Sequence, residues 1–240
     1  MELYYTDSKN VFSNYLNIIG TEVRNISKVK RHKTSDMIFV TDGTDNEYQT
    51  MITTIKKNCI EADIINKTRK VRETTTKVTL AQSIIKGNHM DFIIEKATEL
   101  GVYEIIPIIT ARTIASVSDK KAQRYQKLML TAMKTSTRTH LLHLTKPMIF
   151  DKLLDTFSEY DLTILAYEEE KNNRLTDVLT KKILNKVLLI IGPEGGFSSS
   201  EIKTASERGI KCFSLGIRRL RAETAAISAL SLLLNEQKEM

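Results

Sequence analysis

The residues best suited to chemistry gather in two short segments in the last third of the 240-residue chain. In the first, an apolar run leads into Gly192-Pro193-Glu194-Gly195-Gly196, which is followed by a serine-rich helix start. Three glycines in five residues let the backbone turn sharply and approach a ligand closely. The segment matches neither the GxGxxG nor the Walker pattern, so two interpretations stay open: a ligand-binding loop, or a tight and well-capped turn.

The second segment is Leu215-Gly-Ile-Arg-Arg-Leu-Arg-Ala-Glu-Thr-Ala225, in which three arginines separate a strand end from a helix start. Arginines at such a junction suit phosphate, or negative charge that develops on an oxygen-rich substrate. The alternative is a solvated basic turn. Ligands of open α/β sheets bind outside the carboxyl ends of the strands, and only one helix and one strand separate the two segments. We therefore expect them to share a pocket.

Alternating strands and helices would position these segments. Periodicity predicts strands at 78–85, 102–109, 162–167, 186–192 and 210–215, and helices at 90–100, 119–138, 175–184, 199–208 and 223–236. This alternation predicts an α/β domain with a mainly parallel sheet over residues 73–240. Pro107 argues against a central, fully hydrogen-bonded position for the strand at 102–109.

Residues 1–72 have a different pattern. β-rich runs at 2–6, 37–41, 48–55 and 59–65 are separated by polar turn signals such as Asp42-Gly43, which predicts a small β-barrel-like domain. Two clusters, 28–33 and 67–72, each hold four cationic residues in six. We interpret them as contacts to RNA phosphates, with a solvated charged face as the alternative. The residues concerned are Lys28, Lys30, Arg31, Lys33, Arg69 and Arg72.

The composition narrows the class of protein. Hydrophobic residues make up 41% of the chain and charged residues 27%, which excludes wholesale disorder. The 36 Lys and Arg exceed the 29 Asp and Glu, and the net charge of +7 favours a polyanionic partner. No run approaches the roughly 18 apolar residues of a membrane span, and the start does not resemble a signal peptide. Two distant cysteines predict neither a disulfide scaffold nor a zinc cluster, so we expect a cytoplasmic protein without a metal.

Both segments resemble a known family. Gly192-Pro-Glu-Gly-Gly-Phe-Ser198 and Leu215-Gly-x-Arg-x-Leu-Arg-Ala-Glu-Thr-Ala225 are similar to the signature of the bacterial 16S ribosomal-RNA uridine-N3 methyltransferases. These S-adenosylmethionine-dependent enzymes belong to the SPOUT superfamily. The stretch 86–101, Pro107 and Arg112 also fit this pattern, and Val29-x-Arg31 and Asp42-Gly43 resemble the family's N-terminal domain.

The resemblance implies two domains: a PUA-like RNA-binding β-barrel over 1–72, and a SPOUT α/β domain with a deep trefoil knot over 73–240. It implies a homodimer that methylates N3 of one uridine in 16S rRNA of the small ribosomal subunit. Carried over residue by residue, the S-adenosylmethionine pocket would be lined by Leu165, Ala166, Ile191, Gly192, Gly196, Leu215, Gly216, Leu220, Thr224 and Ala225.

By the same resemblance, Arg138 and Arg221 would contact the target nucleotide, and Glu194 or Glu223 would be the candidate general base. Arg112 would add an RNA contact. For Glu223, a simple interaction with the helix dipole is the favoured alternative. Arginine side chains could stabilise negative charge that spreads onto the uracil oxygens.

The chain departs from the family pattern at three places. Arg219 stands where an apolar residue is usual, Lys30 stands where Leu is typical, and the segment Lys134-Thr-Ser-Thr-Arg138 replaces a Glu-Gln-Ser that precedes the arginine. These departures leave two alternative functions open. One is a methyltransferase for another RNA base or a ribose hydroxyl. The other is an RNA-binding or ribosome-assembly factor that keeps the fold without methylating.

Overall fold

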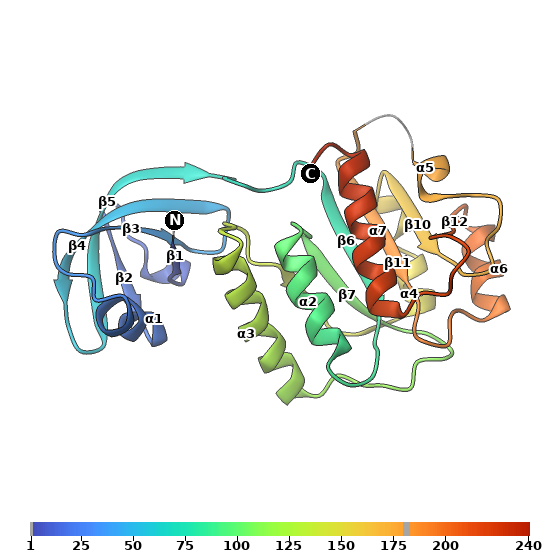
Figure 1. The fold of residues 1–240 in the computed structure, drawn as a ribbon, viewed down its shortest axis with the longest axis horizontal. Helices are drawn as coiled ribbons and strands as arrows, with labels where there is room; N and C mark the ends of the chain where they lie inside the picture. Colours follow the sequence, from blue (N-terminus) through green and yellow to red (C-terminus); the bar gives the residue numbers. More distant parts are fainter. Residues whose placement is uncertain (1, 180–182) are drawn as a thin grey trace. The chain divides into compact units, whose positions relative to one another are not determined.

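The computed structural model describes residues 2–179 and 183–240. The chain forms two compact units, which are described separately (Figure 1). The first combines Met1–Glu73 with Leu130–Leu141, and the second combines Thr74–Met129 with Leu142–Met240. The segment 130–141 thus returns to the N-terminal unit after more than fifty residues of the second unit.

The first unit is built on a curled five-stranded sheet in the order β1-β3-β4-β5-β2 (Figure 1). The strands are β1 (Leu3–Tyr5), β2 (Tyr15–Ile19), β3 (Met37–Thr41), β4 (Asn46–Ile55) and β5 (Cys59–Arg69). β1 pairs with β3 in parallel, and the remaining pairs are antiparallel. The pairing of β4 with β5 shifts register twice, once with an extra residue in each strand, and such bulges bend a strand and increase its twist.

Alternation along these strands buries one face of the sheet. Leu16, Ile18, Val40 and Ile60 are fully buried, whereas Tyr15 on the opposite face of β2 is exposed. A short helix α1 (Thr21–Arg24) and a π-helical turn (Asn25–Val29) join β2 to β3. The sequence predicted β3 with its observed bounds but missed β2 and α1.

The predicted turn at Asp42-Gly43 is confirmed, since β3 ends at Thr41 and β4 begins at Asn46. The buried Asp42 carboxylate accepts hydrogen bonds from the Thr44 N–H and hydroxyl (both 2.8 Å), the Asn46 amide (2.8 Å) and the Tyr48 hydroxyl (2.9 Å). Burial alone would raise the pKa of Asp42, but these hydrogen bonds outweigh it and lower the pKa.

In the second unit, the described residues form a seven-stranded parallel sheet in the order β12-β10-β11-β6-β7-β8, with β9 also beside β7. This confirms the predicted α/β fold with a parallel sheet. The strands are β6 (Lys77–Ser83), β7 (Glu104–Ile109), β8 (His143–Leu144), β9 (Met148–Ile149), β10 (Leu162–Ala166), β11 (Lys186–Ile191) and β12 (Lys211–Phe213).

The prediction from Pro107 holds only in part: β7 lies inside the sheet with β6 on one side, but its pairing on the other side is interrupted at Pro107. On the other side, β8 pairs with Glu104 and Ile105, and β9 pairs with Ile108 and Ile109. Pro107 falls in the gap between these two short strands. A residue without an N–H is tolerated there because no pairing on that side requires one.

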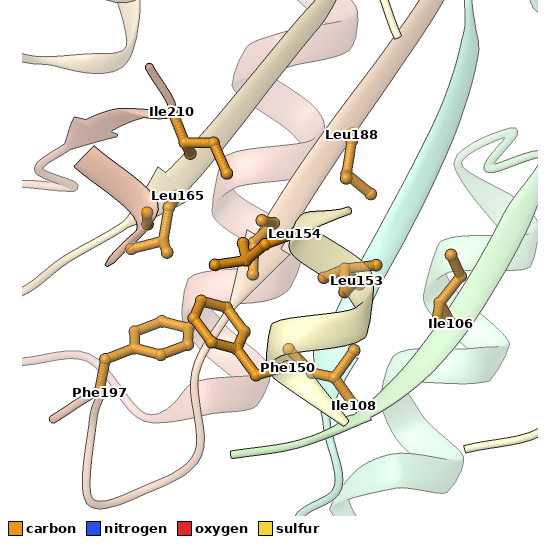
Figure 2. Packing of buried hydrophobic residues seen from close by; sticks show 12 residues of the cluster. Ile106, Ile108, Phe150, Leu153, Leu154, Leu165, Leu188, Phe197 and Ile210 are labelled. Atoms are coloured by element: carbon orange, nitrogen blue, oxygen red, sulfur yellow. The ribbon is translucent and has the colours of Figure 1, made fainter. Parts of the chain in front are cut away.

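Helices pack against both faces of the parallel sheet. α2 (His89–Glu99) packs on α7 (Ala222–Glu236), and α4 (Phe150–Leu154) packs on α6 (Ser199–Glu207). Side chains of α4 and α6 share a buried cluster with the sheet, which includes Leu165, Leu188 and Phe197 (Figure 2). Among the described residues, no helix has both the length and the apolar character needed to cross a bilayer.

Two predicted helices differ from the structure. α3 (Asp119–Thr135) stops three residues before the predicted end at Arg138, where Thr137 adopts a left-handed φ of +57°. α5 covers Leu175–Val178 only, and part of the predicted helix 175–184 lies outside the described residues.

Candidate functional site

One pocket of the second unit lies where three neighbouring strands end. β10, β11 and β12 are adjacent and parallel, so the segments after Ala166, Ile191 and Phe213 leave the sheet at the same edge. The pocket encloses about 590 Å³ of space, part of which is open to solvent. Its walls are Ala166, Tyr167, Glu168, Ile191, Gly192, Pro193, Glu194, Gly196, Phe197, Ser214, Leu215, Gly216, Arg218, Arg219, Leu220, Ala222 and Ala225.

Most of the residues expected to hold the cofactor line this pocket: Ala166, Ile191, Gly192, Gly196, Leu215, Gly216, Leu220 and Ala225. The structure locates the other two elsewhere. Leu165 is fully buried in the core cluster, because its side chain points to the face of β10 opposite that of Ala166 (Figure 2). Thr224 is exposed on the first turn of α7.

Two of the pocket glycines, Gly192 and Gly196, occupy positions where a side chain would collide with a neighbour. A Cβ on Gly192 would come within 2.9 Å of the Phe197 ring, and a Cβ on Gly196, which has a φ of +69°, would overlap the Glu168 carboxylate. Gly216 has a φ of +116°, and a Cβ there would meet no atom within 4 Å, since it would project into open space. Apolar walls with accessible backbone suit an adenosyl group, so the residues present fit S-adenosylmethionine.

The loop 192–197 is held by hydrogen bonds from outside it. Arg112 donates from Nη1 to the Gly195 carbonyl (2.6 Å), and Arg219 donates from Nη2 to the Glu194 carbonyl (3.2 Å). The Glu194 carboxylate accepts from the Lys86 N–H (3.1 Å). Arg112, which we expected to contact RNA, therefore shapes the pocket loop in this structure.

The candidate catalytic residues of the second unit have different surroundings. Glu194 is exposed and lines the pocket. Arg221 is exposed and forms the N-cap position of α7, next to pocket residue Leu220. Glu223 is 15% exposed and pairs with Nδ1 of His89 at 3.1 Å. His89 was missed, since its contact with Glu223 depends on the packing of α2 against α7.

Arg138, the remaining candidate, lies in the first unit and is 3% exposed. Its Nε and Nη2 both donate to Oε2 of Glu73, at 3.0 and 2.7 Å, and hydrogen bonds between charged groups are stronger than those between neutral ones. Glu73 also accepts from the N–H groups of Thr139 (2.7 Å) and His140 (2.8 Å). In this structure Arg138 thus anchors the segment 130–141, and its contact with the nucleotide stays a prediction.

The departure at Lys134 has a structural explanation. Its ammonium group pairs with Glu22 of α1, which is only 5% exposed. A buried carboxylate is costly without a cation beside it. Lys134 therefore contributes a second attachment of the segment 130–141 to the first unit.

The predicted RNA-binding residues divide into two groups. Lys30 pairs with Glu2, while Arg72 pairs with Glu47 and donates to the Thr137 carbonyl (2.7 Å). The others are exposed and make no ion pair within the described residues: Lys28, Arg31, Lys33 and Arg69. These four present their charge to solvent, as a phosphate contact requires.

Two pocket residues that were missed from the sequence are Tyr167 and Glu168. Their position directly after an apolar strand was the signal that could have found them. Arg218, which belongs to the arginine-rich segment singled out from the sequence, lines the pocket as expected. A hydrogen bond from Tyr167 to Glu169 (2.7 Å) raises the pKa of Tyr167 to about 12, so this phenol is protonated at neutral pH. Within the described part of the chain, no group of three or more acidic, His or Cys side chains is arranged for a metal ion.

Comparisons with known proteins agree with this site. The model of a family described as RNA methyltransferase domain matches residues 72–234. Ribosomal RNA small subunit methyltransferase E of Bacillus subtilis is 31% identical over 224 residues, which cover 89% of this chain and 87% of that protein. The Rickettsia conorii protein of the same name is 33% identical over 216 residues, 87% of this chain and 84% of its own.

Solved structures are similar over nearly the whole chain. Ribosomal RNA small subunit methyltransferase E from Neisseria gonorrhoeae, bound to S-adenosylmethionine, is 28% identical with a TM-score of 0.86 and covers 98% of this chain and 97% of its own. A Legionella pneumophila methyltransferase with bound S-adenosylmethionine is 29% identical with a TM-score of 0.84, covering 97% and 96%. By its match to the family model and its identity to these relatives, the chain belongs to the RNA methyltransferase family.

Proposed function

We propose that this protein transfers a methyl group from S-adenosylmethionine to N3 of a uridine in 16S rRNA of the small ribosomal subunit. The observation that carries the proposal is the three-loop pocket, whose glycines and apolar walls fit an adenosyl group. The likeness to small-subunit rRNA methyltransferases, one of them bound to S-adenosylmethionine, supports the substrate class and the cofactor.

Different pocket residues would bind different parts of the cofactor. Ile191, Leu215 and Leu220 supply apolar walls for adenine, and the glycine backbone supplies hydrogen bonds at its edge. Arg218 is available for the cofactor carboxylate. When bound, S-adenosylmethionine supplies an electrophilic methyl group, so the protein must align the uracil nitrogen and help remove its proton.

Glu194 is our candidate for receiving the N3 proton, because it lines the pocket and the Lys86 N–H holds its carboxylate in place. Arg221 would stabilise the negative charge that spreads onto the uracil oxygens as the proton leaves. Glu223 is less suitable as the base because its carboxylate pairs with His89. Its more direct role is to fix the start of α7 beside the pocket.

RNA would be held by the first unit, which we infer to be the PUA-like RNA-binding domain. The exposed cations Lys28, Arg31, Lys33 and Arg69 support this, since each can neutralise a phosphate. We further infer a deep trefoil knot in the last third of the chain and a homodimer in the cytoplasm. The motif resemblance supports both inferences.

The test is a methylation assay on ribosomal particles. Purified protein is incubated with radiolabelled S-adenosylmethionine and small subunits from cells that lack it, and the RNA is digested to nucleosides. We expect label in 3-methyluridine. Label in another nucleoside, or cofactor binding without any labelled rRNA, would favour a different target. Failure of both labelling and cofactor binding would favour the non-methylating RNA-binding factor.

A variant of Arg221 tests whether methyl transfer depends on the proposed site. Arg221→Ala should lower the rate of methyl transfer while the affinity for S-adenosylmethionine stays within a few-fold of the wild type, because Arg221 is not among the residues that line the pocket. Equal rates for the variant and the wild type would remove Arg221 from the reaction and leave the overall function standing.

A further inference from the structure

One side chain connects two walls of the pocket. Arg219, on the segment between β12 and α7, donates from Nη2 to the carbonyl oxygen of Glu194 on the loop after β11 (3.2 Å). Both residues line the pocket, and both belong to the second unit. An apolar residue, which the family pattern usually has at this position, cannot donate such a hydrogen bond.

The segment that carries Arg219 is otherwise loosely held. Gly216 has a φ of +116° with open space around it, and Ile217 is 99% exposed. The Gly216 N–H bonds only locally, to the Ser214 hydroxyl (3.2 Å). Within the described chain, the bond from Arg219 is the one hydrogen bond that ties residues 216–220 to a distant element.

The loop after β11, whose Glu194 carbonyl accepts the hydrogen bond from Arg219, makes more hydrogen bonds to its surroundings. Arg112 binds the Gly195 carbonyl (2.6 Å), the Lys86 N–H binds the Glu194 side chain (3.1 Å), and Gly196 closes a turn onto the Pro193 carbonyl (2.9 Å). Arg219 therefore fastens a loosely held wall of the pocket to a firmly held one. Separation of these two walls would break this bond.

We propose that Arg219 is a positioning residue that latches the 214–221 segment over the cofactor pocket, and that it sets how fast S-adenosylmethionine and its demethylated product leave. The proposal rests on the proposed function, since it takes the pocket to be the cofactor site. A hydrogen bond from a charged donor that breaks before release should slow dissociation by roughly fivefold to tenfold at an exposed position. It should change association little, because affinity differences are expressed mainly in dissociation rates.

The experiment compares the full-length wild type with Arg219→Leu and Arg219→Lys by surface plasmon resonance, using S-adenosylmethionine and S-adenosylhomocysteine as analytes. We expect Arg219→Leu to raise both dissociation rate constants roughly fivefold to tenfold, with association rate constants within about twofold of the wild type. Arg219→Lys, which keeps the charge without the planar fork, should fall between them. Lys211→Gln is the control for a lost surface charge, since Lys211 is exposed on β12 and does not line the pocket.

The outcomes separate the latch from the proposed function. If the wild type binds S-adenosylmethionine and Arg219→Leu releases both ligands at the wild-type rate, the latch is wrong and the proposed function stands. An equal acceleration in Lys211→Gln would also overturn the latch, because net charge would then explain the effect. If the wild type binds neither ligand, the proposed function fails and the latch fails with it.

Discussion

Replacing Gly192 by alanine tests whether the pocket glycine is required by the packing of the core. A Cβ at this position would approach the Phe197 ring at 2.9, 3.1 and 3.3 Å. Phe197 is 3% exposed and packs against Phe150, with ring centroids 5.3 Å apart (Figure 2). The ring is confined by its buried neighbours, so the added methyl group must shift the ring and disturb the packing of the cluster.

The magnitude follows from two opposing effects. Overpacking a core costs about 1–3 kcal/mol, whereas Gly→Ala stabilises by about 0.4–1 kcal/mol through the unfolded chain when φ is compatible. Gly195→Ala is the matched control in the same loop, because its Cβ would meet Arg112 at an ordinary 3.5 Å. The effect on the unfolded chain cancels between the two variants. We therefore expect Gly192→Ala to be about 1–3 kcal/mol less stable than Gly195→Ala.

The assay is urea unfolding followed by circular dichroism, because the chain has no tryptophan to report by fluorescence. Cofactor affinity should fall in Gly192→Ala and stay near the wild-type value in Gly195→Ala, since Gly192 and Phe197 line the pocket and Gly195 does not. Phe197→Leu should make room for the methyl group, so the double variant Gly192→Ala/Phe197→Leu should be more stable than the two single effects predict. Equal stabilities of the two alanine variants, together with additive effects in the double variant, would refute the proposed clash.

Further predictions concern the first unit. Asp42→Asn should lower the unfolding free energy by about 1–3 kcal/mol at pH 7. The hydrogen bonds lower the pKa of Asp42 in the folded protein, so the stability that its carboxylate contributes is complete above the ordinary carboxyl pKa of 3.8 and is lost as pH falls through the folded-state pKa. If the urea midpoints of wild type and variant differed equally at pH 7 and pH 3, the prediction would be contradicted. Glu73→Gln should lower the unfolding free energy by about 3–5 kcal/mol, because the buried Arg138 loses its counter-charge. Much of this stability should be regained in the double variant Glu73→Gln/Arg138→Met. A wild-type urea midpoint for Glu73→Gln would refute the prediction. Arg31→Gln and Lys33→Gln should each reduce the slope of log affinity for RNA against log salt by about 0.7–0.9 in filter binding, and an unchanged slope would exclude a phosphate contact.

The parallel sheet could be predicted because its strands are buried on both faces and appear as continuous apolar runs bounded by glycine or polar residues. β11 and α7, for example, begin or end within one residue of the prediction. β8 and β9 have two residues each and α1 has four, which is too short for any periodicity to mark them.

The attachment of 130–141 to the first unit could not be predicted, because it depends on pairs distant in sequence. Arg138 meets Glu73 and Lys134 meets Glu22, and no local pattern selects these partners. The same limit applies to the site. The glycine pattern predicted most of the pocket, whereas the bonds of Arg112 and Arg219 to the Gly195 and Glu194 carbonyls depend on how three loops meet.

Hydrogen–deuterium exchange with and without saturating S-adenosylmethionine tests most directly whether the three loops form the cofactor site. We expect slower exchange in peptides that cover residues 166–168, 191–197 and 214–222, because bound cofactor occupies backbone groups and shields the loops. Peptides covering 149–151, which line a second cleft, should exchange at the same rate in both states. Protection confined to that second cleft, or no protection in any of the three loops, would contradict the assignment of the cofactor site.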